Sequence, residues 1–359
     1  MIKNFQGDIM NKRYDELNKL IKDWHKNGEQ DDLILRSLYA QVALDKSNLV
    51  DRSEDLKKGT KFSNLSQEDF VSLFKTQSFN NLDKTNIKHL FQELHNRYIK
   101  GKGFDVTRDV AVVNDKSTSA YGYVCYSNDL LFINKDAIDK AKNISPEDKN
   151  FNKTNLGISL LFIIMHESQH VTQYETAIDF ALNKKQDDDK AFLGAMGIIK
   201  NTNFLISDKN NDDFIKYWQQ NYDYRYVEHN ANYSAFEKAM EVLPEDQKKG
   251  KPFDQYNAFT TLLSLRSHSY DEKFVQDRIA KMEKVALKEI EYFEKGTADC
   301  SIKQNVMATV KEFMKVDEKG NSKFRDILHS EISKMAEVSK QAKDNLQKNS
   351  INEELSMSL

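Results

Sequence analysis

Apolar side chains recur every three to four residues along most of this chain, the spacing that places them on one face of an α-helix. The segments with this pattern are residues 11–25, 32–44, 86–99, 155–182, 270–295 and 322–347. Ser66, followed three residues later by Asp69, predicts the capped start of a further short helix that contains Phe70. We therefore expect a predominantly helical protein.

A different pattern begins near residue 101. The Val-rich segment 104–113 and the aromatic and β-branched segments 121–126 and 130–133 are typical of strands. We expect about three short strands here, so the predicted fold class is α+β, predominantly helical. The predicted organisation is an N-terminal helical lobe over residues 1–100, a central core over 101–245, and a C-terminal helical lobe and tail over 246–359.

The composition agrees with a helical protein and excludes some classes of partner. The 359 residues include only 3 prolines and 12 glycines, and 30% of them are charged. The net charge of −3 provides no general attraction for nucleic acid, and no nucleic-acid-binding motif is present, so we expect no nucleic-acid partner. Cys125 and Cys300 lie far apart in the sequence, and we interpret them as ordinary thiols.

The distribution of apolar residues also predicts where the protein is made. The longest apolar run, residues 160–165, is too short to span a bilayer, so no integral membrane segment is expected. The first 20 residues contain no apolar run of the signal-peptide type. We expect a soluble protein, cytoplasmic in the producing cell, that would leave it only through a specialised secretion system.

The residues with the clearest chemistry are His166-Glu167-Ser168-Gln169-His170, inside the helical segment 155–182. His166 and His170 lie about 40° apart on one helix face, so both imidazoles can bind one zinc ion. Glu167 lies beside them and can take a proton from a water that zinc polarises. This motif is expected by chance roughly 0.01 times in such a chain. The apolar run before His166 predicts a buried helix, and buried histidines need partners.

A zinc enzyme usually has three protein ligands and an open position, so a third ligand is expected elsewhere. Glu175 is a poor candidate because it projects about 140° away from His170. Glu228 is the better candidate, since it shares a helix face with the small residues Ala231 and Ala235, which let a second helix approach closely.

Two neighbours of Glu228 extend this hypothesis. His229 is the main alternative ligand, because adjacent helical residues point about 100° apart and only one of the two can face the metal. Asn232, one turn after Glu228, can form a hydrogen bond with a liganding imidazole.

Taken together, residues 103–240 resemble the zincin superfamily, and within it the gluzincins, which pair a His-Glu-x-x-His helix with a downstream Glu on a second helix. The resemblance implies a zincin-like core of a small sheet and two helices. It also implies His166, His170 and Glu228 as ligands of Zn2+ and Glu167 as general base. Residues 123–138 resemble the edge strand that pairs with extended substrate in this superfamily. Asn232 departs from the gluzincin pattern, which has Asp at this position.

The resemblance further implies a tyrosine or histidine that stabilises the oxyanion. We favour Tyr224, one turn before Glu228 on its face. The other candidates for this role are Tyr222, Tyr226, His229 and Tyr233.

These observations predict a zinc-dependent metalloendopeptidase with a protein or peptide substrate. The Lys- and Asn-rich chain is similar in style to bacterial effector and toxin metallopeptidases, and residues 352–359 resemble type IV effector tails, which implies narrow specificity for a host protein. Two alternatives stay open. One is a zinc hydrolase of another amide, and the other is a helical interaction protein with a structural or latent zinc site.

Overall fold

The computed structural model describes residues 60–73, 82–104, 109–113, 122–125, 130–134, 156–207, 212–242 and 269–357, and parts of two helical stretches between residues 15 and 38. Its elements, in chain order, are α3 (Gln67–Ser72), α5 (Lys84–Gly101), β1 (Asp109–Val113), β2 (Gly122–Cys125), β3 (Leu130–Asn134), α7 (Leu156–Ala181), α8 (Asp188–Ser207), α9 (Asp212–Gln220), the 3-10 turn η2 (Tyr222–Tyr224), α10 (Tyr226–Val242), α13 (Glu272–Gly296), α14 (Ser301–Phe313) and α15 (Lys323–Met357).

The helices predicted from apolar spacing are confirmed wherever the structure describes those residues. Helices α5, α7 and α13 begin and end within two residues of their predicted bounds, and α15 begins within one residue but continues to Met357. Ser66 caps α3 as predicted, because its side chain accepts a hydrogen bond from the Asp69 amide. Asp83 and Asp271 cap α5 and α13 in the same way.

The predicted fold class, α+β with a zincin-like core, is wrong, because the packed body of the protein is all-helical. The strands are confined to a sheet of order β1-β3-β2, with β1 parallel and β2 antiparallel to β3. They contain five, four and five residues, whereas nearly all of the buried apolar side chains that the structure describes belong to helices. The predicted segments 104–113, 121–126 and 130–133 each overlap one of these strands, so the error lies in the class assigned to the whole fold. The strand β2, within the segment expected to pair with substrate, lies at one edge, whereas β3 is central.

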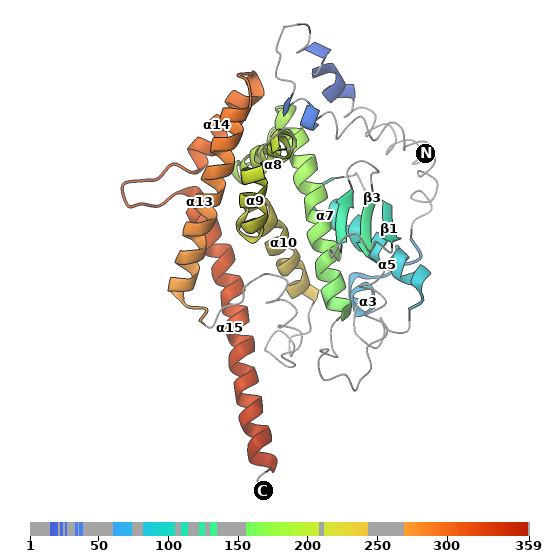
Figure 1. Ribbon diagram of the computed structural model, residues 1–359. Coiled ribbons are helices and arrows are strands. Elements are labelled where there is room, and N and C mark those ends of the chain that lie inside the picture. The colour runs from blue at the N-terminus through green and yellow to red at the C-terminus, as the bar shows by residue number, and fades with distance from the viewer. Residues whose placement is uncertain are drawn as a thin grey trace.

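Helix α7 lies at the centre of the helical body. In Figure 1 the strands lie on one side of it and α8 and α10 on the other. From residue 161 to 178 its side chains are buried with the exception of His166, which is partly exposed. A helix that is apolar on almost every face is stable only when other elements surround it. The run of apolar residues that leads into the motif therefore has the buried position expected of it.

Two glycines let α8 pack closely on α7. A methyl group at Gly194 would lie 2.9 Å from both the Thr176 carbonyl oxygen and the Phe180 Cβ. At Gly197, one turn closer to the metal-ligand candidates, it would lie 3.3 Å from the Ala177 Cβ. The absence of side chains at these positions allows the second half of α8 to reach the region between α7 and α10.

Among the helices that the structure describes, none has both the length and the apolar character needed to cross a membrane. Helix α15 packs on α13 and α10, and its C-terminal part extends beyond the other helices in Figure 1. The division of the chain at residues 100 and 245 stays a prediction.

Candidate metal centre

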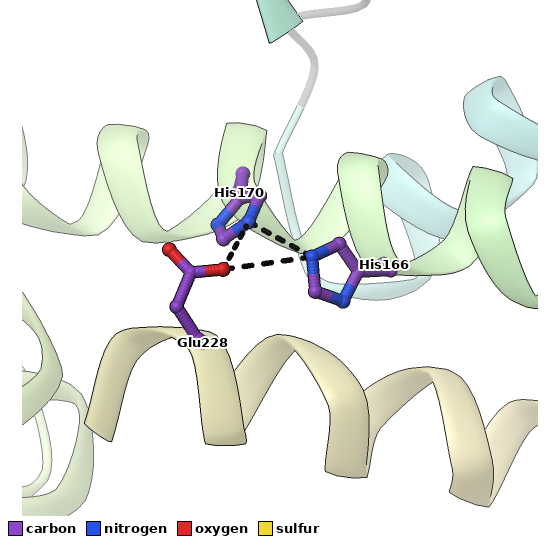
Figure 2. Close-up of side chains that lie close together, drawn as sticks. All are labelled: His166, His170 and Glu228. Carbon is purple, nitrogen blue, oxygen red and sulfur yellow. Dashed lines mark hydrogen bonds and ion pairs between the residues drawn. The ribbon is translucent and has the colours of Figure 1, made fainter. Parts of the chain in front are cut away.

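The histidines of α7 meet a carboxylate of α10. The Nε2 atoms of His166 and His170 are 3.1 Å apart, and the Glu228 Oε2 atom lies 3.7 Å from the first and 3.2 Å from the second. Figure 2 shows the two rings and the carboxylate directed toward one another across the gap between the helices. These three are the group of described residues whose donor atoms are close enough to hold one metal ion. The structure thus brings together the three residues that the sequence suggested as ligands.

The hydrogen bond at Nδ1 of each imidazole determines whether its Nε2 atom is free to bind a metal. His166 Nδ1 lies 2.8 Å from the Asn232 side-chain oxygen, and His170 Nδ1 lies 2.9 Å from the Gln173 side-chain oxygen. Both oxygens accept, so each Nδ1 carries the proton. In the neutral rings the Nε2 lone pairs then face each other and the Glu228 carboxylate.

This convergence of electron-pair donors fits a metal ion. Glu228 Oε2 is buried and accepts no hydrogen bond of normal geometry, and a cation placed among these donors would offset their repulsion. Four ligands at zinc–nitrogen and zinc–oxygen bond lengths form a tetrahedron with edges of roughly 3.3 Å. The three measured separations, 3.1, 3.2 and 3.7 Å, are close to that edge. The three residues present therefore fit zinc.

The electrostatic potential at the centre is negative and favours the binding of a cation. Burial by itself lowers the pKa of His166, but the neighbouring Glu228 and Glu167 carboxylates outweigh it, so the pKa is raised and the ring attracts positive charge. Burial by itself raises the pKa of Glu228, yet the charges of Lys200 and His170 hold it well below the usual range. Glu228 is therefore a carboxylate, the form that binds metal.

Glu228 is held by two cations through its other oxygen. Lys200 of α8 donates to Oε1 over 3.0 Å, and the Arg225 guanidinium lies 3.7 Å from the same atom. Arg225 is completely buried, bonds to Glu289 over 2.7 Å, and lies over the Trp218 ring. The third ligand candidate is thus fastened to α8 and α13 as well as to its own helix.

Glu167, the predicted general base, is buried on α7 next to His166. Its negative charge contributes to the raised pKa values of both His166 and Tyr222. Glu167 therefore lies within electrostatic range of the cluster without being one of its three donors.

Tyr224, the tyrosine favoured for the oxyanion role, faces another part of the protein. Its ring lies 3.7 Å from the Lys281 ammonium and 5.1 Å from the Arg278 guanidinium, both on α13. The structure does not bring it to the histidines. Tyr222, also considered for this role, is 47% exposed. Loss of hydration around its hydroxyl raises its pKa, and the Glu228 and Glu167 charges raise it further. Tyr222 is thus the tyrosine with a resolved electrostatic link to the centre.

The remaining candidates have structural partners. His229, the alternative third ligand, is buried and bonds through Nε2 to Glu331 of α15 over 2.9 Å. Tyr226 packs between Phe192 and Phe324. Tyr233 donates to Glu237 and accepts from Lys334. Adjacent residues of α10 therefore have different partners. Glu228 contacts His166 and His170, whereas His229 bonds to Glu331 of α15.

The sequence did not predict three residues that contact the centre: Gln173, Lys200 and Arg225. Gln173 was available from the sequence, because a residue three positions after His170 shares its helix face. Its amide is oriented by hydrogen bonds to the Val227 carbonyl and to Asn230. Lys200 and Arg225 carry no local signal, since their roles depend on how α8 and α10 pack. Asn232 was predicted to bond to a liganding imidazole; it does bond to the His166 ring, and the metal-binding role of that ring stays a prediction.

Comparison of the chain with models of protein families, with curated proteins and with solved structures found no match. The functional argument therefore rests on the centre itself.

Proposed function

We propose that this protein is a zinc-dependent metallopeptidase whose ion is held by His166, His170 and Glu228. The observation that carries the proposal is the convergence of two imidazole Nε2 atoms and one undonated carboxylate oxygen within 3.7 Å of one another. Two histidines four residues apart on one helix and a Glu on a second helix resemble the ligand set of the gluzincins. The resemblance concerns the ligands and their order in the chain.

The chemistry divides between the ion and the protein. Zinc, when bound, supplies Lewis acidity toward a water molecule and a carbonyl oxygen. Glu167 accepts the proton of the attacking water and later donates it to the amide nitrogen as the peptide bond breaks. Tyr222 remains protonated because its pKa is raised, so its hydroxyl can donate to the carbonyl oxygen as negative charge develops there. In this role Tyr222 replaces Tyr224.

We further propose that the substrate is a protein or extended peptide, and that the enzyme is a narrow-specificity bacterial effector that acts on a host protein. The support is the Lys- and Asn-rich composition of the chain, which is similar in style to that of effector metallopeptidases. Detection of new protein N-termini in host lysate, after exposure to the unaltered protein or to Glu167→Gln, tests this part of the proposal and would identify the cleaved bond.

The first prediction tests the chemistry through Glu167→Gln. The amide is nearly isosteric with the carboxylate but cannot accept the proton, so we expect peptide cleavage to fall by about 100-fold or more. Zinc content should stay at the level of the unaltered protein, because Glu167 is not a ligand. Peptide hydrolysis and metal analysis of the same preparations measure both quantities.

Glu241→Gln is a matched control, since this exposed residue of α10 makes the same change of charge at a distance from the centre. It should retain full activity. Undiminished cleavage by Glu167→Gln, or loss of its zinc, would rule out the assigned role.

A further inference from the structure

The two carboxylate oxygens of Glu228 have different environments. Oε1 accepts from Lys200 over 3.0 Å and lies 3.7 Å from Arg225, whereas Oε2 faces the two imidazoles and no hydrogen-bond donor reaches it. A carboxylate can bind a metal through one oxygen or through both. In Glu228, Oε1 is already paired with the cationic side chains of Lys200 and Arg225 in the absence of a metal.

The two cations are not equivalent. Arg225 is neutralised by Glu289, which bonds to its Nε over 2.7 Å, and it is buried completely. Lys200 is 18% exposed at its side chain, and Glu228 is the carboxylate that lies within ion-pair distance of it in the described structure. Lys200 is therefore the counter-ion of Glu228, whereas Arg225, the residue before α10, is mainly paired with Glu289 of α13.

Lys200 reaches Glu228 because α8 packs closely on α7. The nearest turn of α8 carries Gly197, and the next turn back carries Gly194, where a methyl group would lie 2.9 Å from the α7 backbone. Lys200 follows Gly197 by three residues, on the same face of the helix. The position of the ammonium group thus results from helix packing that brings a third helix to the centre.

We propose that Lys200 is a positioning residue. Its hydrogen bond to Oε1 keeps that oxygen away from the metal, so that Glu228 binds the metal through Oε2 alone. This inference rests on the proposed metal centre. One-oxygen binding gives three protein donors and leaves the fourth position open for water or substrate. If Oε1 were released, it could rotate onto the metal as an additional donor and crowd that position.

Cobalt(II) is a suitable probe, because its visible absorption is intense at four-coordinate sites and weakens as the coordination number rises. We expect the unaltered protein to bind one cobalt ion per chain with an intense visible spectrum. Lys200→Met, which keeps an unbranched side chain one atom shorter and removes its charge, should bind one cobalt ion with a clear loss of absorption per ion. X-ray absorption should show two carboxylate oxygens on cobalt in the variant and one in the unaltered protein.

Lys284→Met removes a charge from an exposed site on α13 and is the matched control, with the spectrum of the unaltered protein expected. Identical spectra for Lys200→Met and the unaltered protein, both with one bound cobalt, would overturn the role of Lys200 and leave the metal centre standing. Absence of stoichiometric cobalt from the unaltered protein would instead overturn the centre itself. X-ray absorption on the unaltered protein tests the inference even if the variant does not fold, since two-oxygen binding by Glu228 there would contradict it.

Discussion

At the scale of single residues, this centre depends on which atoms are left without a hydrogen-bond donor. Asn232 and Gln173 each accept a hydrogen bond from the Nδ1 of one imidazole, and Lys200 donates one to Oε1 of Glu228. The remaining three atoms, the two Nε2 atoms and Glu228 Oε2, face one another and could all bind the same cation. The surrounding amides and the ammonium group therefore shape the centre as much as its three donors do.

A prediction at this scale distinguishes Glu228 from its neighbour. Glu228→Gln should lower zinc affinity by more than roughly 100-fold, the upper end of what losing a supporting group around a metal costs. His229→Ala should leave zinc affinity nearly unchanged, because His229 bonds to Glu331 instead. Competition with a coloured chelator measures both affinities. A large loss with His229→Ala and none with Glu228→Gln would reverse the assignment.

The hydrogen-bond partners of the imidazoles lead to a second prediction. Gln173→Ala removes the acceptor that orients His170, and zinc affinity should fall by roughly 10- to 100-fold. Asn232→Ala should have a similar effect through His166. Gln276→Ala, an exposed glutamine on α13, is the control. Chelator competition measures the zinc affinities. If the Gln173→Ala and Asn232→Ala proteins bind zinc as tightly as the control, these two residues do not orient the imidazoles.

At the scale of elements, the centre results from the packing of α7 against α10 and α8. The donors on α7 and α10 are brought together by contacts along both helices, and α8 adds the ammonium group of Lys200. The close contact at Gly194 constrains the distance between α8 and α7, because backbone as well as side chain of α7 lies in the way. Changes at this contact should therefore affect stability more than changes at the exposed surfaces of the same helices.

The prediction at this scale concerns Gly194→Ala. A methyl group 2.9 Å from the Thr176 carbonyl must push the helices apart, which should lower the free energy of unfolding by about 1–3 kcal/mol. Gly197→Ala is the comparison, since its methyl group would lie at 3.3 Å from a side-chain atom, and the helix preference of Ala offsets part of that cost. Urea unfolding of the metal-free protein measures both, and equal stability of the two variants would contradict the packing argument.

At the scale of the whole molecule, the metal would join parts of the chain that are distant in sequence. His166 and His170 are separated from Glu228 by the whole of α8 and α9, and Glu228 is linked through Arg225 and Glu289 to α13. A ligand that binds only the folded arrangement stabilises the entire cooperative unit. The binding of zinc should therefore be visible in the unfolding of the protein as a whole.

This leads to the last prediction. Zinc at 100 times its dissociation constant should raise the free energy of unfolding by about 2.7 kcal/mol, because the unfolded chain lacks the assembled centre. Glu228→Gln should abolish most of this gain at the same zinc concentration. Thermal unfolding with and without zinc, each compared with magnesium as a control ion, provides the measurement. An equal shift with magnesium, or no shift with zinc, would contradict a specific centre.

The sequence by itself determined the features that depend on local geometry. Helical spacing predicted α5, α7, α13 and α15, Ser66 predicted the start of α3, and the four-residue separation placed His166 and His170 on one face. These predictions succeed because 3.6 residues per turn relates near neighbours without any knowledge of the rest of the fold. Small residues around Glu228 also pointed to a close helix contact, and the structure brings Glu228 to the histidines.

Only the tertiary structure decided the features that depend on how helices pack. It showed an all-helical body where an α+β fold with a zincin-like core was predicted, placed Tyr224 against α13 rather than at the centre, and brought Lys200 to Glu228 from a third helix. Residues on different helices meet according to crossing angle and axial offset, which follow from the shapes of both surfaces together. Periodicity identifies the face that a residue occupies, but the partner of that face is set by packing.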